Sequence, residues 1–173
     1  MTVRQVYETI VNLAQRDSAL GPIEVEFGKP WHPNHDRGSK VPNGAAGGLY
    51  LYTRPGIGEW RIDAKDNPND VWYIGKSQKD IGGRVWHHLG SIYEPGVKGV
   101  ECVPRFKYHK WSRNCDYIAP EIRNAIAEGE VVIYTVALKN SAGFPYLAEL
   151  VEKVALTEYA FAFNKIPPLN RSF

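Results

Sequence analysis

Residues 71 to 90 combine, around one strand-to-helix turn, side chains that could bind an anion and move a proton. The stretch reads VWYIGKSQKDIGGRVWHHLG and carries Tyr73, Lys76, Arg84, His87 and His88. Arginine presents a planar fork of N–H donors that fits a phosphate, and a tyrosine hydroxyl can hold or deprotonate a water molecule. A free tyrosine has a pKa of about 10, so acting as a base at neutral pH requires help from its neighbours. In the alternative interpretation the tyrosines pack a half-buried sheet and the arginine is a solvated helix residue.

The rest of the chain indicates one small α+β domain that would position these side chains. With 173 residues and 43% hydrophobic content, the chain can bury one core. Apolar spacing predicts helices over 3–16, 80–93, 120–128 and 145–165, and strands over 48–53, 71–75 and 131–138. Asp80 stands where a cap of the second helix is expected. This order predicts a small, mainly antiparallel sheet flanked by helices.

Two regions stand apart from this predicted core. Residues 1–46 are expected to form an N-terminal arm, with an amphipathic helix followed by a loop rich in Gly, Pro and Asn. Residues 47–173 form the core, and a basic, aromatic insertion interrupts it at about 94–119.

The positive charge of the chain is concentrated beside the turn. The formal net charge of +2 does not by itself indicate a nucleic-acid partner, but residues 72 to 113 hold eight basic and three acidic side chains. The segment RFKYHKWSRN (105–114) interleaves cations with aromatic rings, which suits contact with phosphates and bases. The candidate DNA-binding residues are Arg105, Lys107, Lys110, Trp111 and Arg113. A solvated loop with a small apolar cluster is the alternative.

Cysteine usage and hydropathy favour a soluble protein of a reducing compartment. Cys102 and Cys115 form no disulfide framework, and together with His109 they lack the compact spacing of a zinc site. No stretch approaches the roughly 18 apolar residues that a membrane span requires, and the N-terminus lacks the apolar core of a signal peptide. We therefore expect a cytoplasmic protein.

Five separated features of the sequence resemble the GIY-YIG nucleases. Gly-Leu-Tyr ends at Tyr50, Tyr-Ile-Gly begins at Tyr73, and Arg84 lies on the helix that follows. Glu158 is followed by Pro167 nine residues later and by Asn170 twelve residues later, which matches the end of that family's core. Leucine replaces the isoleucine of the first motif, a change of similar apolar volume. His88, four residues after Arg84, resembles the pairing in restriction-enzyme members of the family.

The resemblance implies a metal-dependent DNA endonuclease whose catalytic residues are Tyr50, Tyr73, Arg84, His88, Glu158 and Asn170. Glu158 would hold one Mg²⁺ or Mn²⁺ per active site, with water and phosphate completing the coordination. Arg84 and Lys76 would bind phosphate, Tyr50 would act as general base, and Asn170 would anchor the site through hydrogen bonds. We expect Glu149 and Glu152 to be ordinary solvated helix residues, and His87 to lie on the surface.

The compact chain favours a type II restriction enzyme acting on double-stranded DNA. A repair, homing or structure-selective nuclease is the alternative, and a non-catalytic nucleic-acid-binding protein is a third possibility. Because one hydrolytic centre cuts one strand, cutting both strands requires a symmetric dimer or two sequential nicking events, and we favour a homodimer formed on DNA. The apolar face of the first helix (Val3, Val6, Ile10 and Leu13) is the candidate contact, and packing of this face on its own core is the alternative.

Overall fold

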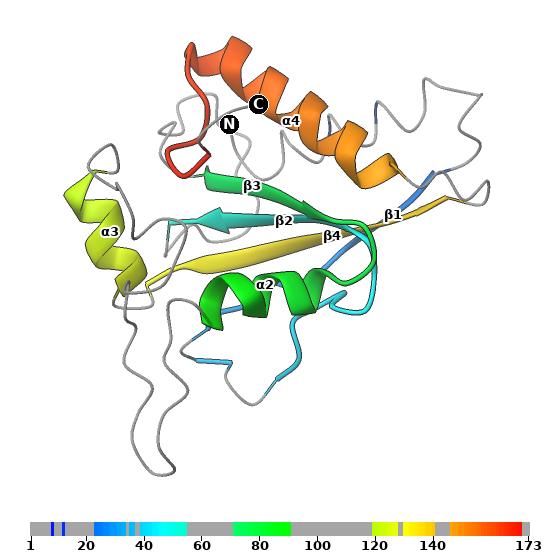
Figure 1. The fold of residues 1–173 in the computed structure, drawn as a ribbon, viewed down its shortest axis with the longest axis horizontal. Helices are drawn as coiled ribbons and strands as arrows, with labels where there is room; N and C mark the ends of the chain where they lie inside the picture. The colour runs from blue at the N-terminus through cyan, green and yellow to red at the C-terminus, as the bar shows by residue number, and fades with distance from the viewer. Residues whose placement is uncertain are drawn as a thin grey trace.

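Four strands form one antiparallel sheet at the centre of the computed structural model (Figure 1). The structure describes residues 8, 12, 23–33, 35, 36, 39–54, 71–90, 119–127, 130–140 and 146–170. The strands are β1 (Ile23–Phe27), β2 (Gly48–Thr53), β3 (Val71–Ser77) and β4 (Val132–Asn140), in the order β1-β4-β2-β3. The helices are α2 (Ile81–Gly90), α3 (Pro120–Ala127) and α4 (Leu147–Phe163). The predicted α+β class with an antiparallel sheet is confirmed.

The two faces of the sheet carry two separate cores. Successive side chains of a strand point to opposite faces, so Leu49 and Leu51 of β2 pack against α4 while Tyr50 and Tyr52 pack with α2. Figure 1 shows α2 and α4 on opposite sides of the sheet. The hydrophobic cluster on the α4 side contains two tyrosines, Tyr134 and Tyr159, whereas the cluster on the α2 side contains three, Tyr50, Tyr52 and Tyr73. The tyrosines of the two sequence motifs therefore lie on the α2 side of the sheet.

The predicted elements of the core agree with the structure. The strands at 48–53, 71–75 and 131–138 correspond to β2, β3 and β4, and the helices at 120–128 and 145–165 correspond to α3 and α4. Of the predicted helix 3–16 only Glu8 and Asn12 are described, and both are helical and exposed. The insertion predicted at 94–119 lies outside the described residues apart from Ala119. No helix in the described part of the chain is long and apolar enough to cross a membrane.

Strand β1 was not predicted, and it belongs to the segment interpreted as an arm. Its residues alternate, with Ile23, Val25 and Phe27 half-buried against the α4 core and the intervening glutamates exposed. This period of two is the signature of a strand with one buried face. Pairing with β4 makes β1 an edge of the sheet, so part of residues 1–46 is built into the core.

The turn between β3 and α2 is fixed by local hydrogen bonds. The Asp80 carboxylate accepts a hydrogen bond from the Gly83 N–H at 2.7 Å, as an N-cap does, and Ser77 Oγ accepts one from the Asp80 N–H at 3.1 Å. Ile81 and Val85 are fully buried and hold α2 on the sheet. Because Val85 points inward, the neighbouring positions Arg84 and His88 are carried to a defined place beside the sheet.

Candidate active site

Tyr50 and Tyr73, from the two sequence motifs, meet on the α2 face of the sheet. Their ring centroids lie 5.9 Å apart, and both rings are buried. The β2–β3 register pairs Tyr50 with Gly75 and Tyr52 with Tyr73. Tyr52 thus joins the pair as a third tyrosine, 5.9 Å from Tyr50 and 5.6 Å from Tyr73 between ring centroids.

Gly75 leaves the space that the tyrosines occupy. A Cβ at this position would stand 2.6 Å from Cζ and 2.7 Å from Oη of Tyr50, and it would also meet the ring of Tyr73. Real Cβ atoms do not approach other atoms so closely. The glycine of Tyr-Ile-Gly is therefore required because the hydroxyl of Tyr50 crosses over the backbone of β3 at that residue.

Helix α2 adds His88 and Arg84 to the tyrosines. His88 is buried, and its ring centroid lies 5.6 Å from both Tyr50 and Tyr73. Arg84, one turn earlier, is exposed to solvent, and its guanidinium donates a hydrogen bond to Tyr50. Tyr50 in turn donates a hydrogen bond to Tyr73. The structure thus brings together the four residues that the sequence predicted from strands and helix.

Burial keeps both motif tyrosines protonated. Loss of water contact is the main reason that the pKa of Tyr50 is raised far above its ordinary value, and its interactions with Tyr73 raise it further, against the lowering effect of Arg84. The pKa of Tyr73 is also raised, chiefly by burial, while the hydrogen bond from Tyr50 lowers it. In this arrangement neither tyrosine is a base at neutral pH without a further group that takes its proton.

Asn170 holds the outer edge of β3 in the middle of the Tyr-Ile-Gly motif. Its side chain accepts a hydrogen bond from the Ile74 N–H at 3.0 Å and donates one to the Ile74 carbonyl at 2.9 Å. The Leu169 N–H donates to the Trp72 carbonyl at 2.8 Å. The chain after α4 thus takes the place of a neighbouring strand, which is the anchoring role expected of Asn170.

Lys76, predicted to bind phosphate, is engaged by two carboxylates of α4. Its Nζ lies 2.9 Å from Glu149 Oε1 and 3.6 Å from Glu152 Oε2. Only 14% of the Glu152 side chain is exposed, against 43% for Glu149. The expectation that both glutamates are solvated is wrong for Glu152, because the edge of β3 covers it.

Glu158 lies elsewhere on α4. Its side chain is exposed, and the separation of six positions from Glu152 turns the helix through about 600°, so the two side chains point roughly 120° apart. Glu152 is the one whose charge acts on Tyr73. The structure therefore encloses a carboxylate that the sequence did not select, against Lys76 on the α4 side of the sheet, and leaves the selected one accessible to solvent.

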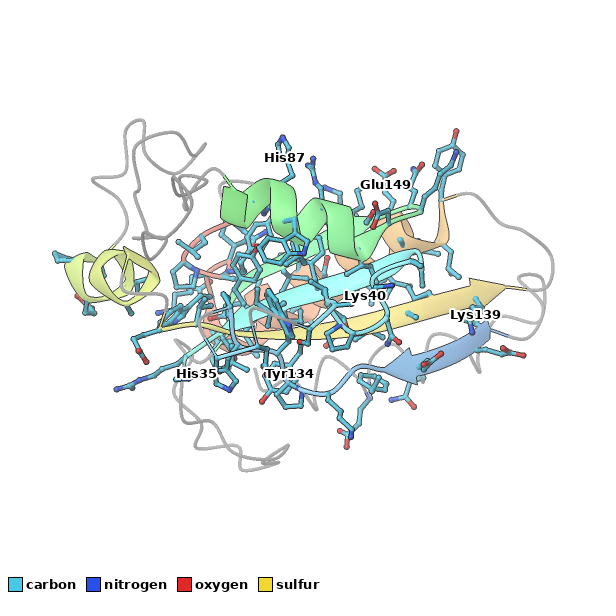
Figure 2. The ribbon with its side chains drawn as sticks, turned by 90° about the horizontal axis from the view of Figure 1, so that it is seen from below. His35, Lys40, His87, Tyr134, Lys139 and Glu149 are labelled. Carbon is cyan, nitrogen blue, oxygen red and sulfur yellow. The ribbon has the colours of Figure 1, made fainter. Side chains whose placement is uncertain are left out.

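The remaining predicted residues divide between the surface and the part that is not described. Figure 2 shows His87 projecting from α2 away from the sheet, as expected of a surface residue. The DNA-binding candidates Arg105, Lys107, Lys110, Trp111 and Arg113 lie outside the described residues, as do Cys102, His109 and Cys115.

Comparison of this chain with protein-family models, with curated proteins and with solved structures returned no match.

The described residues contain no group of three or more His, Cys, Asp or Glu side chains that could hold a metal ion. A single accessible carboxylate such as Glu158 still fits Mg²⁺ or Mn²⁺, since Mg²⁺ keeps several waters and is bound through one or two carboxylates together with substrate phosphates. The Glu158 carboxylate thus suits a metal ion whose coordination is completed by water and by the substrate.

Sequence reasoning missed Tyr52 and Glu152. Tyr52 had a signal, because it lies two residues after Tyr50 and a strand returns to the same face every second residue. Glu152 had none, since its burial depends on where β3 meets α4.

Gly75→Ala is expected to displace the tyrosine pair and destabilise the fold by about 1–3 kcal/mol, the usual range for overpacking. Chemical denaturation would measure the stability, and near-ultraviolet circular dichroism the aromatic packing. Ile74→Val is the matched control, since Ile74 packs on the α4 face and its truncation should leave the aromatic signal intact. An unchanged aromatic signal in Gly75→Ala would contradict the proposed contact.

The raised pKa of Tyr50 predicts a loss of stability in alkali. In the unfolded chain this tyrosine ionises near the ordinary tyrosine pKa of 10.0, whereas in the folded chain it stays protonated to higher pH. The unfolded state therefore releases the proton first, and stability that is complete below pH 10 falls above it, by up to about 1.4 kcal/mol per pH unit for one proton. Denaturation across this pH range should show that the free energy of unfolding of Tyr50→Phe falls less steeply than that of the wild type. Parallel curves of stability against pH would refute the burial effect.

Proposed function

We propose that this chain is a metal-dependent endonuclease that hydrolyses phosphodiester bonds in DNA, with the chemistry of the GIY-YIG nucleases. The observation that carries the proposal is the meeting of Tyr50, Tyr73, Arg84 and His88 in one cluster. A cluster of phenol, imidazole and guanidinium groups at the edge of a sheet suits attack by water on a phosphate.

Arg84 is the residue of this cluster that receives the phosphate. Its side chain is exposed although it donates a hydrogen bond to the buried Tyr50. The guanidinium therefore contacts both the tyrosine pair and the solvent. The remaining N–H donors can form paired hydrogen bonds to the phosphate oxygens and offset charge that builds up as water attacks.

Tyr50 and His88 accept the proton that the attacking water loses. Water forms a bond to phosphorus, the bond to the 3′-oxygen breaks, and the departing oxygen is protonated by solvent. Since burial keeps Tyr50 protonated, it accepts a proton from the water only as its own proton leaves. An imidazole gains a proton near neutral pH, and the ring of His88 packs directly against Tyr50.

Glu158 would hold the divalent metal, which when bound stabilises negative charge on the phosphate and the departing oxygen. Its exposed position on α4 leaves the carboxylate open to an ion that arrives with water and substrate. We further propose a type II restriction enzyme, on the basis of the pairing of His88 with Arg84 on α2, with the basic segment around Trp111 contacting the duplex.

Glu158→Gln is expected to abolish DNA cleavage while DNA binding persists, because the amide keeps the shape and loses the charged metal ligand. Cleavage of a plasmid library and gel-shift binding would measure the two properties, with Mg²⁺, with Mn²⁺ and with EDTA. Glu121→Gln, at an exposed position of α3, is the matched control and should cut like the wild type. Full activity in EDTA, or in Glu158→Gln, would rule out the metal-dependent mechanism.

Arg84→Ala is expected to lower kcat roughly 100- to 1,000-fold, as removal of one preorganised electrostatic donor does. Arg84→Lys should recover only part of the loss, because an ammonium cannot form the paired hydrogen bonds of the guanidinium. Tyr50→Phe should be severely impaired too. Single-turnover cleavage would measure the rates of these three variants. If Tyr50→Phe cut normally and Tyr73→Phe were inactive, the roles assigned to the two tyrosines would have to be exchanged.

A further inference from the structure

A groove lies on the α2 side of the sheet, where α2 meets the loop that precedes β2. Its volume is about 930 Å³, which is within the range of pockets that bind small molecules. Trp86 of α2 lines it together with a set of small residues, which are Gly44, Ala45, Ala46, Gly82 and Gly83. Because these residues lack long side chains, they leave room for a flat ring beside the indole of Trp86.

Trp86 is exposed to solvent and is also held in place. Of its surface 44% is exposed, and its ring packs edge to face with the buried Trp31, with 5.5 Å between the ring centroids. Trp31 is itself fixed, since its Nε1 donates a hydrogen bond to Ser39 Oγ at 3.0 Å and its backbone pairs with Ile133. A large ring that is already supported loses little freedom on binding, so Trp86 suits the stacking of an aromatic ligand.

The charged residues of the groove suit a ligand that also carries an anionic group. The Asp80 carboxylate accepts a hydrogen bond from the Gly83 N–H at 2.7 Å, and Glu26 Oε2 lies 3.4 Å from Lys139 Nζ, so each carboxylate of the groove has a partner in the protein. Lys40 adds an exposed ammonium, and the first turn of α2 adds the positive end of the helix dipole. Figure 2 shows Lys40 and Lys139 on the same side of α2. An aromatic ring joined to a phosphate, as in a nucleotide, therefore matches the groove.

The groove and the candidate active site lie on the same side of the sheet, on the two flanks of α2. Tyr50, to which Arg84 donates a hydrogen bond, belongs to the core on this side. Arg84 and Trp86 are two positions apart, so their side chains project about 200° apart around the helix. Gly83 and His87 occupy the exposed face between them. Because Gly83 has no side chain, a DNA strand can cross α2 at this point from Arg84 to the groove.

We propose that this groove binds one unstacked nucleotide of the DNA strand whose phosphate lies at Arg84, with the base against Trp86 and a phosphate beside Lys40. This inference rests on the proposed nuclease function and adds to it a binding site outside the motif residues. Stacking on an aromatic side chain tolerates any base, because every base has a π face. The groove therefore holds the strand in place relative to Arg84 without reading its sequence.

Trp86→Ala is expected to raise the Kd for an oligothymidylate single strand about 5- to 100-fold, as loss of one base stacked on an aromatic ring does. Trp86→Phe should lose less affinity, because it keeps a ring. Tyr146→Ala, which removes another exposed aromatic ring before the first turn of α4, is the matched control and should bind like the wild type. Fluorescence anisotropy in EDTA would measure the Kd without cleavage, and thermal unfolding would show that each variant folds.

Lys40→Met tests the phosphate contact separately from the stacking. Each phosphate contact that is lost should reduce the slope of log Kd against log salt concentration by about 0.7 for a single strand. Lys153→Met removes an exposed lysine of α4, on the other side of the sheet, and is the matched control that should leave the slope unchanged. The same anisotropy titrations, repeated over a range of salt concentrations, supply the slopes.

Three results would overturn the inference while leaving the proposed nuclease function intact. These are wild-type affinity in Trp86→Ala, an equal loss of affinity in Tyr146→Ala, and equal salt slopes in Lys40→Met and Lys153→Met. A wild-type protein that neither binds nor cuts DNA with Mg²⁺ or Mn²⁺ would instead refute the nuclease function, and the nucleotide site in the groove with it.

Discussion

The antiparallel pairing of β2 with β3 is the constraint on which the candidate active site depends. Its register places Tyr50 opposite Gly75 and Tyr52 opposite Tyr73, so three phenol rings share one face while leucines occupy the other. A shift of one residue would send the tyrosines into the hydrophobic core under α4. The glycine matters as much as the tyrosines, because only a residue without a Cβ leaves room for the Tyr50 hydroxyl.

The edge of β3 is where the rest of the molecule supports this pairing. An edge strand leaves backbone groups without a neighbouring strand, and here the chain after α4 satisfies them at Trp72 and Ile74. Two residues further along, Lys76 forms an ion pair that ties the end of the strand to α4. Strand β3 is therefore held on both sides, by β2 within the sheet and by side chains of the C-terminal segment, and the Tyr-Ile-Gly motif lies between these attachments.

Most of the elements could be predicted because each depends on local information. The aromatic and β-branched residues of β2 and β4, the helical spacing in α4 and the Asp80 cap of α2 are properties of neighbouring residues. Strand β1 alternates apolar residues with glutamates, but it is only five residues long and lies next to a loop rich in Gly and Pro, so its local pattern is weak. Its position became clear only from its pairing with β4.

The features of the candidate site also divide into those that the sequence predicted and those that only the structure revealed. The sequence by itself determined which residue types are present, and it placed Tyr50, Tyr73, Arg84 and Asn170 in motifs whose order predicted that they would meet. Only the tertiary structure decided that Tyr52 completes the cluster, that Glu152 is enclosed and that Glu158 is exposed. The reason is physical: glutamates 149, 152 and 158 look alike along the helix, and what distinguishes them is the angle at which α4 packs on the sheet, which no local pattern contains.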